Sequence, residues 1–106
     1  MKLNLIETKD ILDFEKEIKH ELVVNERSLD ILSKIKLKKY YAAFEHAEIV
    51  DGGVLIGAYG DGDTIDEAIS NYCLEVSNKR IRFTGSNIIR EEIVFPTLVH
   101  GKLLNK

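Results

Sequence analysis

A helix start at Thr64 constrains the fold of this chain more than any other feature. Thr64-Ile65-Asp66-Glu67 has the form of a capping box, in which the threonine hydroxyl and the glutamate carboxylate each accept a hydrogen bond from the other residue's backbone N–H. Ser77-Asn78-Lys79 ends the helical pattern. The sequence therefore predicts an amphipathic helix over residues 64–76. Its apolar stripe comprises Ile65, Ala68, Ile69, Tyr72, Cys73 and Val76.

The segment before this helix predicts a β-hairpin. Residues 40–50 are rich in aromatic, alanine and β-branched residues, which favours one long strand. Asp51-Gly52-Gly53 is a turn signal because both glycines accept a positive φ, and residues 54–59 form the returning strand. Gly57 interrupts that strand and indicates a bulge or a close approach of backbone or ligand. Gly60-Asp61-Gly62-Asp63 is expected to end it.

The segment after the helix predicts a second hairpin. Residues 80–84 alternate strictly between polar and apolar side chains, which is typical of a half-buried strand. A turn at Gly85-Ser86-Asn87 leads to a last strand over about residues 90–95, which Pro96 stops. Residues 97–106 are weakly patterned and are expected to fray.

The N-terminal part is expected to be helical. Thr8 or Asp10 would cap a first helix, and Ser28 would cap a short second one. The apolar stripe of the first helix is Ile11, Phe14, Ile18 and Leu22. The apolar face of the second is Leu29, Leu32 and Ile35.

This element order predicts an α+β fold, a two-layer sandwich in which an antiparallel sheet of about four strands carries helices on one face. A length of 106 residues allows one domain. Within it, residues 1–37 are the helical N-terminal part, residues 38–96 form the hairpin–helix–hairpin core, and residues 97–106 are the tail.

The composition limits where the protein is expected to reside and which class of molecule it is expected to bind. The first ten residues interrupt their apolar side chains with charged ones, unlike a signal peptide, and no run approaches the ~20 apolar residues of a membrane span. We therefore expect the cytoplasm and no membrane. The net charge of −3 argues against a general nucleic-acid binder. Residues 38–79 carry −5 and residues 80–106 carry +3, which fits either a mixed solvated surface or a polarised surface that meets a charged partner.

Two patterns resemble ligand sites but have a simpler explanation. Asp61, Asp63, Asp66 and Glu67 are ligands that a hard cation prefers, yet their spacing does not match a calcium loop and helix capping explains them. The glycines between residues 57 and 62 follow a strand and precede a helix, but the neighbouring aspartates would repel a phosphate. We expect no metal and no cofactor.

No pair of candidate catalytic groups is expected to be adjacent. His46 and Glu48 share a strand face and form a possible acid–base pair, whereas Glu45 would point to the opposite face. A partly exposed strand histidine is the simpler interpretation. Cys73 lies on the apolar helix stripe and is expected to be a buried small side chain, not a nucleophile. The sequence therefore predicts a protein that is not an enzyme.

Arginines and tyrosines supply the candidate binding residues. Arg80 and Arg82 share a strand face and are expected to pair with Glu91 and Glu92 on the next strand. If those glutamates point elsewhere, the arginines form a small anion-binding patch with stacking surfaces beside it. The candidate partner-binding residues are Tyr41, Tyr59, Arg80, Arg82 and Arg90.

The middle of the chain resembles a group of small proteins from phages and prophages of low-GC Gram-positive bacteria. The resemblance spans about residues 38–96 and brings no established catalytic residues. It rests on Tyr41-Ala42-Ala43-Phe44-Glu45, Asp51-Gly52-Gly53, Gly57-Ala58-Tyr59-Gly60-Asp61-Gly62-Asp63-Thr64 and Glu67-Ala68-Ile69-x-x-Tyr72. Residues 62–68, Gly-Asp-Thr-Ile-Asp-Glu-Ala, are also similar to the turn and helix start of the HicB-type antitoxin domain.

These resemblances imply two functions. The first is a phage-type accessory binding protein that occupies a host or phage protein, or a small anionic ligand, through one face of its sheet. The alternative is a HicB-like antitoxin module that neutralises a toxin, with nucleic-acid contact through the basic C-terminal part. A homo-oligomer is compatible with either function, and nucleic acid is not expected to be the main partner.

Overall fold

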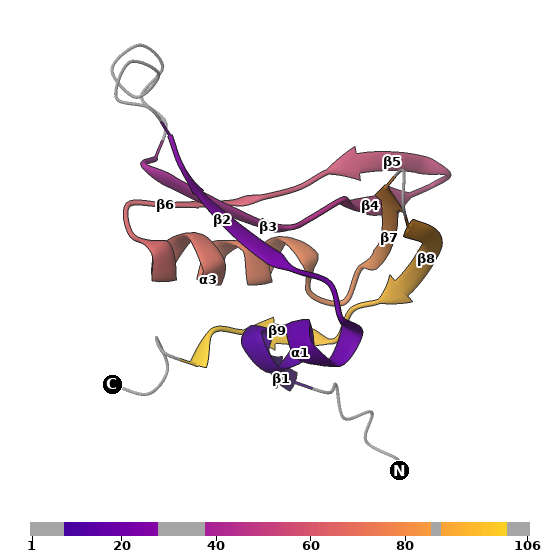
Figure 1. The fold of residues 1–106 in the computed structure, drawn as a ribbon, viewed down its shortest axis with the longest axis horizontal. Coiled ribbons are helices and arrows are strands. Elements are labelled where there is room, and N and C mark those ends of the chain that lie inside the picture. Colours follow the sequence, from indigo (N-terminus) through magenta and orange to yellow (C-terminus); the bar gives the residue numbers. More distant parts are fainter. Residues whose placement is uncertain (1–7, 28–37, 86–87, 102–106) are drawn as a thin grey trace.

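The computed structural model describes residues 8–27, 38–85 and 88–101, with the backbone alone for residues 85 and 88–90. It confirms the α+β class and contains a four-stranded antiparallel sheet (Figure 1). In chain order the elements are β1 (Thr8–Asp10), α1 (Ile11–Ile18), β2 (Leu22–Glu26), β3 (Tyr40–Phe44), β4 (Ala47–Asp51), β5 (Val54–Gly57), β6 (Gly60–Gly62), α3 (Ile65–Val76), β7 (Arg80–Gly85), β8 (Ile88–Val94) and β9 (Thr97–Val99).

The four-stranded sheet has the order β5-β4-β7-β8 and contains both predicted hairpins. Strands β4 and β5 pair around Gly52 and Gly53, whose φ angles of 57° and 87° confirm the turn. The alternation predicted for β7 is also confirmed, because Ile81 and Phe83 are buried. Strands β5 and β8 form the two edges of this sheet.

The prediction of one strand over residues 40–50 was wrong, because the chain turns at Glu45 and His46. His46 has a φ of 63°, which separates β3 from β4 and sends the two strands into different sheets. Strand β3 lies between β2 and β6 in a three-stranded antiparallel sheet. Figure 1 shows how the long hairpin passes from one sheet to the other.

The glycine-rich segment also differs from the prediction, since residues 60–62 continue as strand β6. Helix α3 packs against β6 and β3 so closely that neither Gly60 nor Gly62 has room for a Cβ atom. A Cβ at Gly60 would overlap backbone atoms of Tyr72 and Ala68. These two glycines therefore allow the helix and the sheet to touch.

The core lies between α3, the two sheets and the terminal elements. Phe44 is its centre, because its ring makes edge contacts with Phe14, Tyr72, Phe83 and Phe95 at centroid distances of 5.7–6.4 Å. Of the predicted helix stripe, all residues except Ile65 are buried. Ile65 is 48% exposed because it opens the helix at the surface.

The start of α3 confirms the cap at Thr64. The Thr64 hydroxyl accepts a hydrogen bond from the backbone N–H of Glu67 at 3.1 Å. The Glu67 carboxylate accepts from the N–H of Asp63 at 3.3 Å, one residue before the position that the capping box predicts.

We expect Thr64→Ala to lower the free energy of unfolding by about 1 kcal/mol, because the helix loses its N-cap acceptor. Chemical denaturation measures the change, with Thr64→Ser as the control that keeps the hydroxyl. Equal midpoints for the alanine variant and the native chain would show that this cap contributes nothing.

The N-terminal part is not wholly helical. Helix α1 is capped by Asp10, whose carboxylate accepts from the N–H of Leu12, as predicted. The helix ends at Ile18, because Lys19 adopts a φ of 59°, and Leu22 begins strand β2. The expected second helix, from Ser28, lies outside the described residues.

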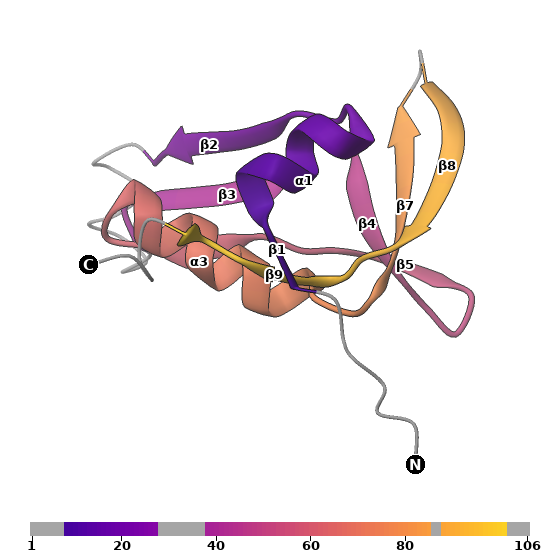
Figure 2. The ribbon, with the colours of Figure 1, turned by 90° about the horizontal axis from the view of Figure 1, so that it is seen from below.

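The tail prediction was wrong for residues 97–101. Strand β9 pairs in parallel with β1, Leu98 is buried, and the Ser77 hydroxyl accepts from the N–H of Leu98 at 2.8 Å. These two strands lie below α3 in Figure 1 and in front of it in Figure 2, which views the chain from below. Ser77, at the end of α3, therefore helps to hold strand β9, whose own sequence shows no clear strand pattern.

No helix within the described ranges is both long enough and apolar enough to cross a bilayer.

Candidate partner-binding surface

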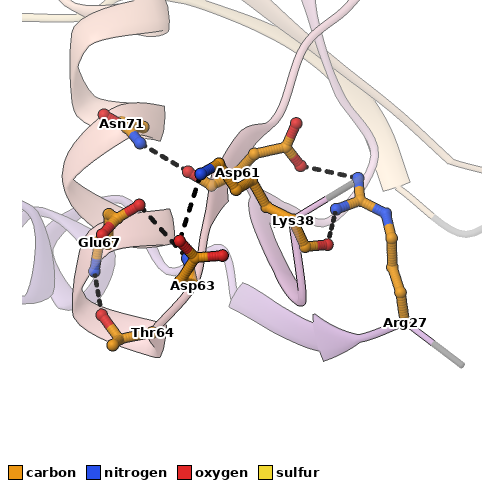
Figure 3. A network of polar contacts seen from close by, with 7 residues as sticks. All are labelled: Arg27, Lys38, Asp61, Asp63, Thr64, Glu67 and Asn71. Carbon is orange, nitrogen blue, oxygen red and sulfur yellow. Dashed lines mark hydrogen bonds and ion pairs between the residues drawn. The ribbon is translucent and has the colours of Figure 1, made fainter. Parts of the chain in front are cut away.

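Arg27 belongs to a polar network at the end of the three-stranded sheet, where it contacts Asp61 and Lys38 (Figure 3). Its guanidinium lies 2.7 Å from the Asp61 carboxylate and donates to the backbone carbonyl of Lys38 at 2.7 Å. Asn71 on α3 donates to the carbonyl of Asp61 at 2.6 Å. The network therefore connects the chain just after β2 and just before β3 with β6 and α3, and only 9% of the Arg27 side chain is exposed.

The two candidate tyrosines meet at this arginine. The rings of Tyr41 and Tyr59 are 6.1 Å apart in an edge contact. The Arg27 guanidinium lies 4.6 Å from the Tyr41 centroid and 5.6 Å from the Tyr59 centroid, both within cation–π range. Tyr41 is half-buried by these contacts, whereas Tyr59 is 50% exposed and presents a ring surface to solvent.

The acidic cluster separates into individual contacts. Asp61 pairs with Arg27, Asp63 with Lys38 at 3.2 Å, and Asp66 with the buried His100 at 2.7 Å. Asp66 and Glu67 lie in the first turn of α3, as the capping prediction requires. The ion pairs of the three aspartates were not part of that prediction. Within the described part of the chain, no three His, Cys, Asp or Glu side chains are grouped to hold a metal ion.

The histidines do not occupy the predicted arrangement. His46 lies in the turn and contacts Glu45 at 3.5 Å, whereas Glu48 accepts a hydrogen bond from Thr84. The possible His46–Glu48 pair is not formed, and the expectation that Glu45 points away from His46 was wrong, because the turn at His46 removes the strand alternation on which both depended. His46 is partly exposed, as predicted.

Cys73 is buried, as predicted. Burial, together with a smaller contribution from the nearby Asp10 carboxylate, raises the pKa of its thiol to about 12. Burial likewise raises the pKa of Tyr72 to about 12. Both side chains stay protonated in the folded chain near neutral pH, which makes Cys73 a poor nucleophile.

These two groups predict a loss of stability in alkali. The unfolded chain releases the Cys73 proton near pH 9 and the Tyr72 proton near pH 10, whereas the folded chain keeps both until about pH 12. The free energy of unfolding is therefore unaffected by these groups below pH 9 and decreases as the pH rises through this window. Urea midpoints at pH 8 and about pH 10.5 measure the slope, which Tyr72→Phe should reduce. An unchanged slope in that variant would contradict the assignment.

Arg80 and Arg82 pair with one glutamate instead of two. Arg82 lies opposite Glu92 and binds it at 2.8 Å, and Arg80 approaches the same carboxylate at 3.4 Å. Glu91 instead contacts His20, which stacks on Phe83. The side chain of Arg90, in β8, lies outside the described residues.

We expect the double variant Arg80→Ala, Arg82→Ala to lose no more than about 1 kcal/mol of stability, since exposed ion pairs contribute about 0–1 kcal/mol. Thermal and chemical denaturation test this, with Glu92→Gln as the variant that removes the shared partner. A loss of several kcal/mol would show that the pairs support the fold.

A groove of about 700 Å³ opens between strands β4 and β5 and the C-terminal end of α3. Tyr59 and Arg80 contribute to it, so the structure brings two of the five candidate residues to one surface, while Arg82 is not in its lining. The lining residues are Ile49, Val50, Asp51, Ile56, Gly57, Ala58, Tyr59, Asp61, Glu75, Lys79 and Arg80.

The edge strand β5 forms one wall of this groove. All four of its residues are exposed, including Val54 at 60% and Ile56 at 44%. Gly57 pairs with Glu48 in a regular register, and no atom lies within 4 Å of its Cβ position, so the structure shows neither the predicted bulge nor a close approach of the backbone. We define the β5 edge surface as Val54, Leu55, Ile56 and Tyr59, together with the groove.

Sequence reasoning missed Arg27 and the β5 edge. Arg27 carries no local pattern, because its partners lie 11 to 34 residues further along the chain. The Val54-Leu55-Ile56 run was recognised as a strand, but only the sheet order shows that it lies at an edge. The one sequence signal for an exposed edge was the uncharged apolar run that follows the Gly52-Gly53 turn.

Comparisons of this chain with protein-family models, with curated proteins and with solved structures give no match.

Proposed function

We propose that this chain is a non-catalytic binding module that engages a protein partner through the β5 edge surface. The observation that carries the proposal is a strand of three exposed apolar residues at a sheet edge, next to a groove. Natural edge strands are usually protected by charge, proline or a covering element. Strand β5 contains neither a charged residue nor a proline.

The groove has the mixed lining of a protein-binding surface. Ile49, Ile56, Ala58 and Tyr59 supply apolar and aromatic area, and charged side chains border it. Exposed apolar patches with a polar border are typical of interaction sites. Tyrosine is also among the residues enriched at protein interfaces.

A small anionic ligand fits this groove less well. Its charged lining has three carboxylates and two cations, and one of those cations, Arg80, is paired with Glu92. A phosphate or carboxylate ligand would therefore meet more negative than positive charge. We retain the protein partner and set the anionic ligand aside.

The absence of catalysis is part of the same proposal. The groove supplies carboxylates and cations but neither a histidine nor a cysteine. Cys73, the single thiol of the chain, is buried in the core. In the phage setting that the sequence resemblance implies, the partner would be a host or phage protein.

Site-directed photo-cross-linking tests the proposal. A benzoylphenylalanine in place of Leu55 should give an adduct with one protein in lysate of the cells that carry the gene, and excess native chain should compete it away. The same probe in place of Leu12, an exposed apolar residue of α1, is the matched control. Adducts at neither position, or equally at both, would overturn the proposal.

The identity of the adduct separates the functional classes. A large host protein supports the accessory binding protein, whereas a single toxin-sized partner supports the HicB-like antitoxin alternative.

Labelled oligonucleotides provide the second test. Submicromolar binding near 150 mM salt that the double variant Arg80→Ala, Arg82→Ala abolishes, and that weakens steeply with added salt, would favour the antitoxin class.

A further inference from the structure

We propose that the β5 edge surface takes an extended segment of its partner, which adds a strand to β5 and places an apolar and a basic side chain, two residues apart, in the groove. This inference rests on the proposed function and specifies the chemistry of the partner. It follows from the backbone edge of β5, from the apolar wall of the groove and from the charges that border it.

The backbone of β5 offers an unused ladder. The two-residue turn sets Asp51 opposite Val54, and the register continues through Ile49 opposite Ile56. Hydrogen-bonded pairs alternate along an antiparallel ladder and begin at the residues that flank a two-residue turn. Val54 and Ile56 therefore direct their backbone groups to β4, while Leu55 and Gly57 direct theirs outward, where an added strand would bind them.

The groove lies on one face of this edge. Ile56 and its cross-strand partner Ile49 both line it, and the alternation of β4 sets Asp51 on the same face as Ile49. Side chains of an added strand that are two residues apart also share a face. One of them would contact the isoleucines while the other approaches Asp51.

The unpaired charges of the groove select a basic side chain. Asp61 is bound to Arg27 and Arg80 to Glu92, whereas Asp51 and Glu75 are exposed and make no ion pair with a described residue. Lys79 supplies the single remaining cation of the lining. Two available carboxylates against one available cation favour a lysine or arginine on the partner.

A second copy of this chain is a poorer occupant. It would present the same edge, in which Val54, Leu55, Ile56 and Gly57 carry no cation for the two carboxylates. Self-association through β5 is therefore an outcome of the test and not the proposal.

A designed peptide probes the inference directly. The probe is a fluorescein-labelled octapeptide in which valine and lysine alternate on one face, with threonine at every intervening position. Fluorescence anisotropy should show binding that weakens at least tenfold when the lysines become glutamates. Methylation of the threonine amides, which removes ladder donors and leaves the side chains, should abolish it. Equal binding of the three peptides, or no binding of the valine–lysine peptide, would overturn the inference.

Variants of the chain test which of its groups contact the peptide. Leu55→Pro removes the outward N–H without disturbing the ladder to β4, so it should lose peptide binding while Leu55→Ala keeps most of it. The double variant Asp51→Lys, Glu75→Lys should prefer the glutamate peptide, and the exposed pair Asp13→Lys, Glu21→Lys is the charge-matched control. An unchanged preference in the first double variant would overturn the charge assignment, and circular dichroism confirms that each variant folds.

Two results separate this inference from the proposed function. A partner cross-linked at Leu55 together with peptides that bind alike would retain the protein-binding function and reject strand addition. A dimer in light scattering that Leu55→Pro dissociates would also reject the inference and assign the edge to self-association. Cross-linking at neither position would remove the proposed function itself.

Discussion

Gly60→Ala is expected to lower the free energy of unfolding by about 3 kcal/mol, at the upper end of typical overpacking costs. The new Cβ would overlap the backbone nitrogen of Tyr72 and the carbonyl oxygen of Ala68. These are backbone atoms of α3, so rotation of one side chain cannot remove the overlap. The helix and the sheet would have to move apart. Chemical denaturation measures the loss as a lower midpoint with an unchanged slope.

Gly57→Ala is the matched control for this prediction. Gly57 lies three residues earlier in the same hairpin arm, yet a Cβ there meets no atom within 4 Å. We expect a change within about 0.5 kcal/mol, or a small gain from the stiffer unfolded chain. Similar losses in the two variants would indicate that glycine acts through general strand flexibility and not through helix contact.

Arg27→Ala is expected to cost about 2 kcal/mol, less than the loss of one partner from a fully buried pair because Asp61 is one-third exposed. The substitution removes the ion pair with Asp61, the bond to the Lys38 carbonyl and the cation over Tyr41. It also removes the cation beside the Tyr59 ring, which keeps its edge contact with Tyr41. Urea denaturation gives the free energy, and tyrosine fluorescence reports the change around the rings.

Arg27→Lys distinguishes charge from geometry. Lysine keeps the positive charge but lacks the planar group that reaches the carboxylate and a carbonyl together while it stacks on a ring. We therefore expect it to restore less than half of the loss. Full restoration by lysine would show that charge alone holds the network, and full stability of the alanine variant would show that the network is dispensable.

Local chemistry determined the parts of this fold that the sequence predicted. The cap at Thr64, the buried stripe of α3, the Asp51-Gly52-Gly53 turn and the alternation of β7 each depend on residues within a few positions of one another. Capping geometry, positive φ at glycine and the two-residue period of a strand act at that range. The α+β class and the four-stranded antiparallel sheet followed from them.

Tertiary packing determined the features of the fold that the sequence did not predict. The break at His46 divides one apolar run between two sheets, and only the pairing of β3 with β2 and β6 explains it. Leu98 is buried because β9 pairs with β1, which lies near the other end of the sequence. This long-range pairing forms a strand where the local sequence pattern is weak.

Tertiary packing also determined the candidate binding surface. Arg27, Tyr41, Tyr59 and Asp61 are brought together by three strands, and Tyr59, Glu75 and Arg80 meet in the groove from separate elements. Periodicity determines which face of an element is apolar, because it depends on the chain's own geometry. Which faces and edges stay uncovered depends on how distant elements pack, and the exposure of β5 is decided there.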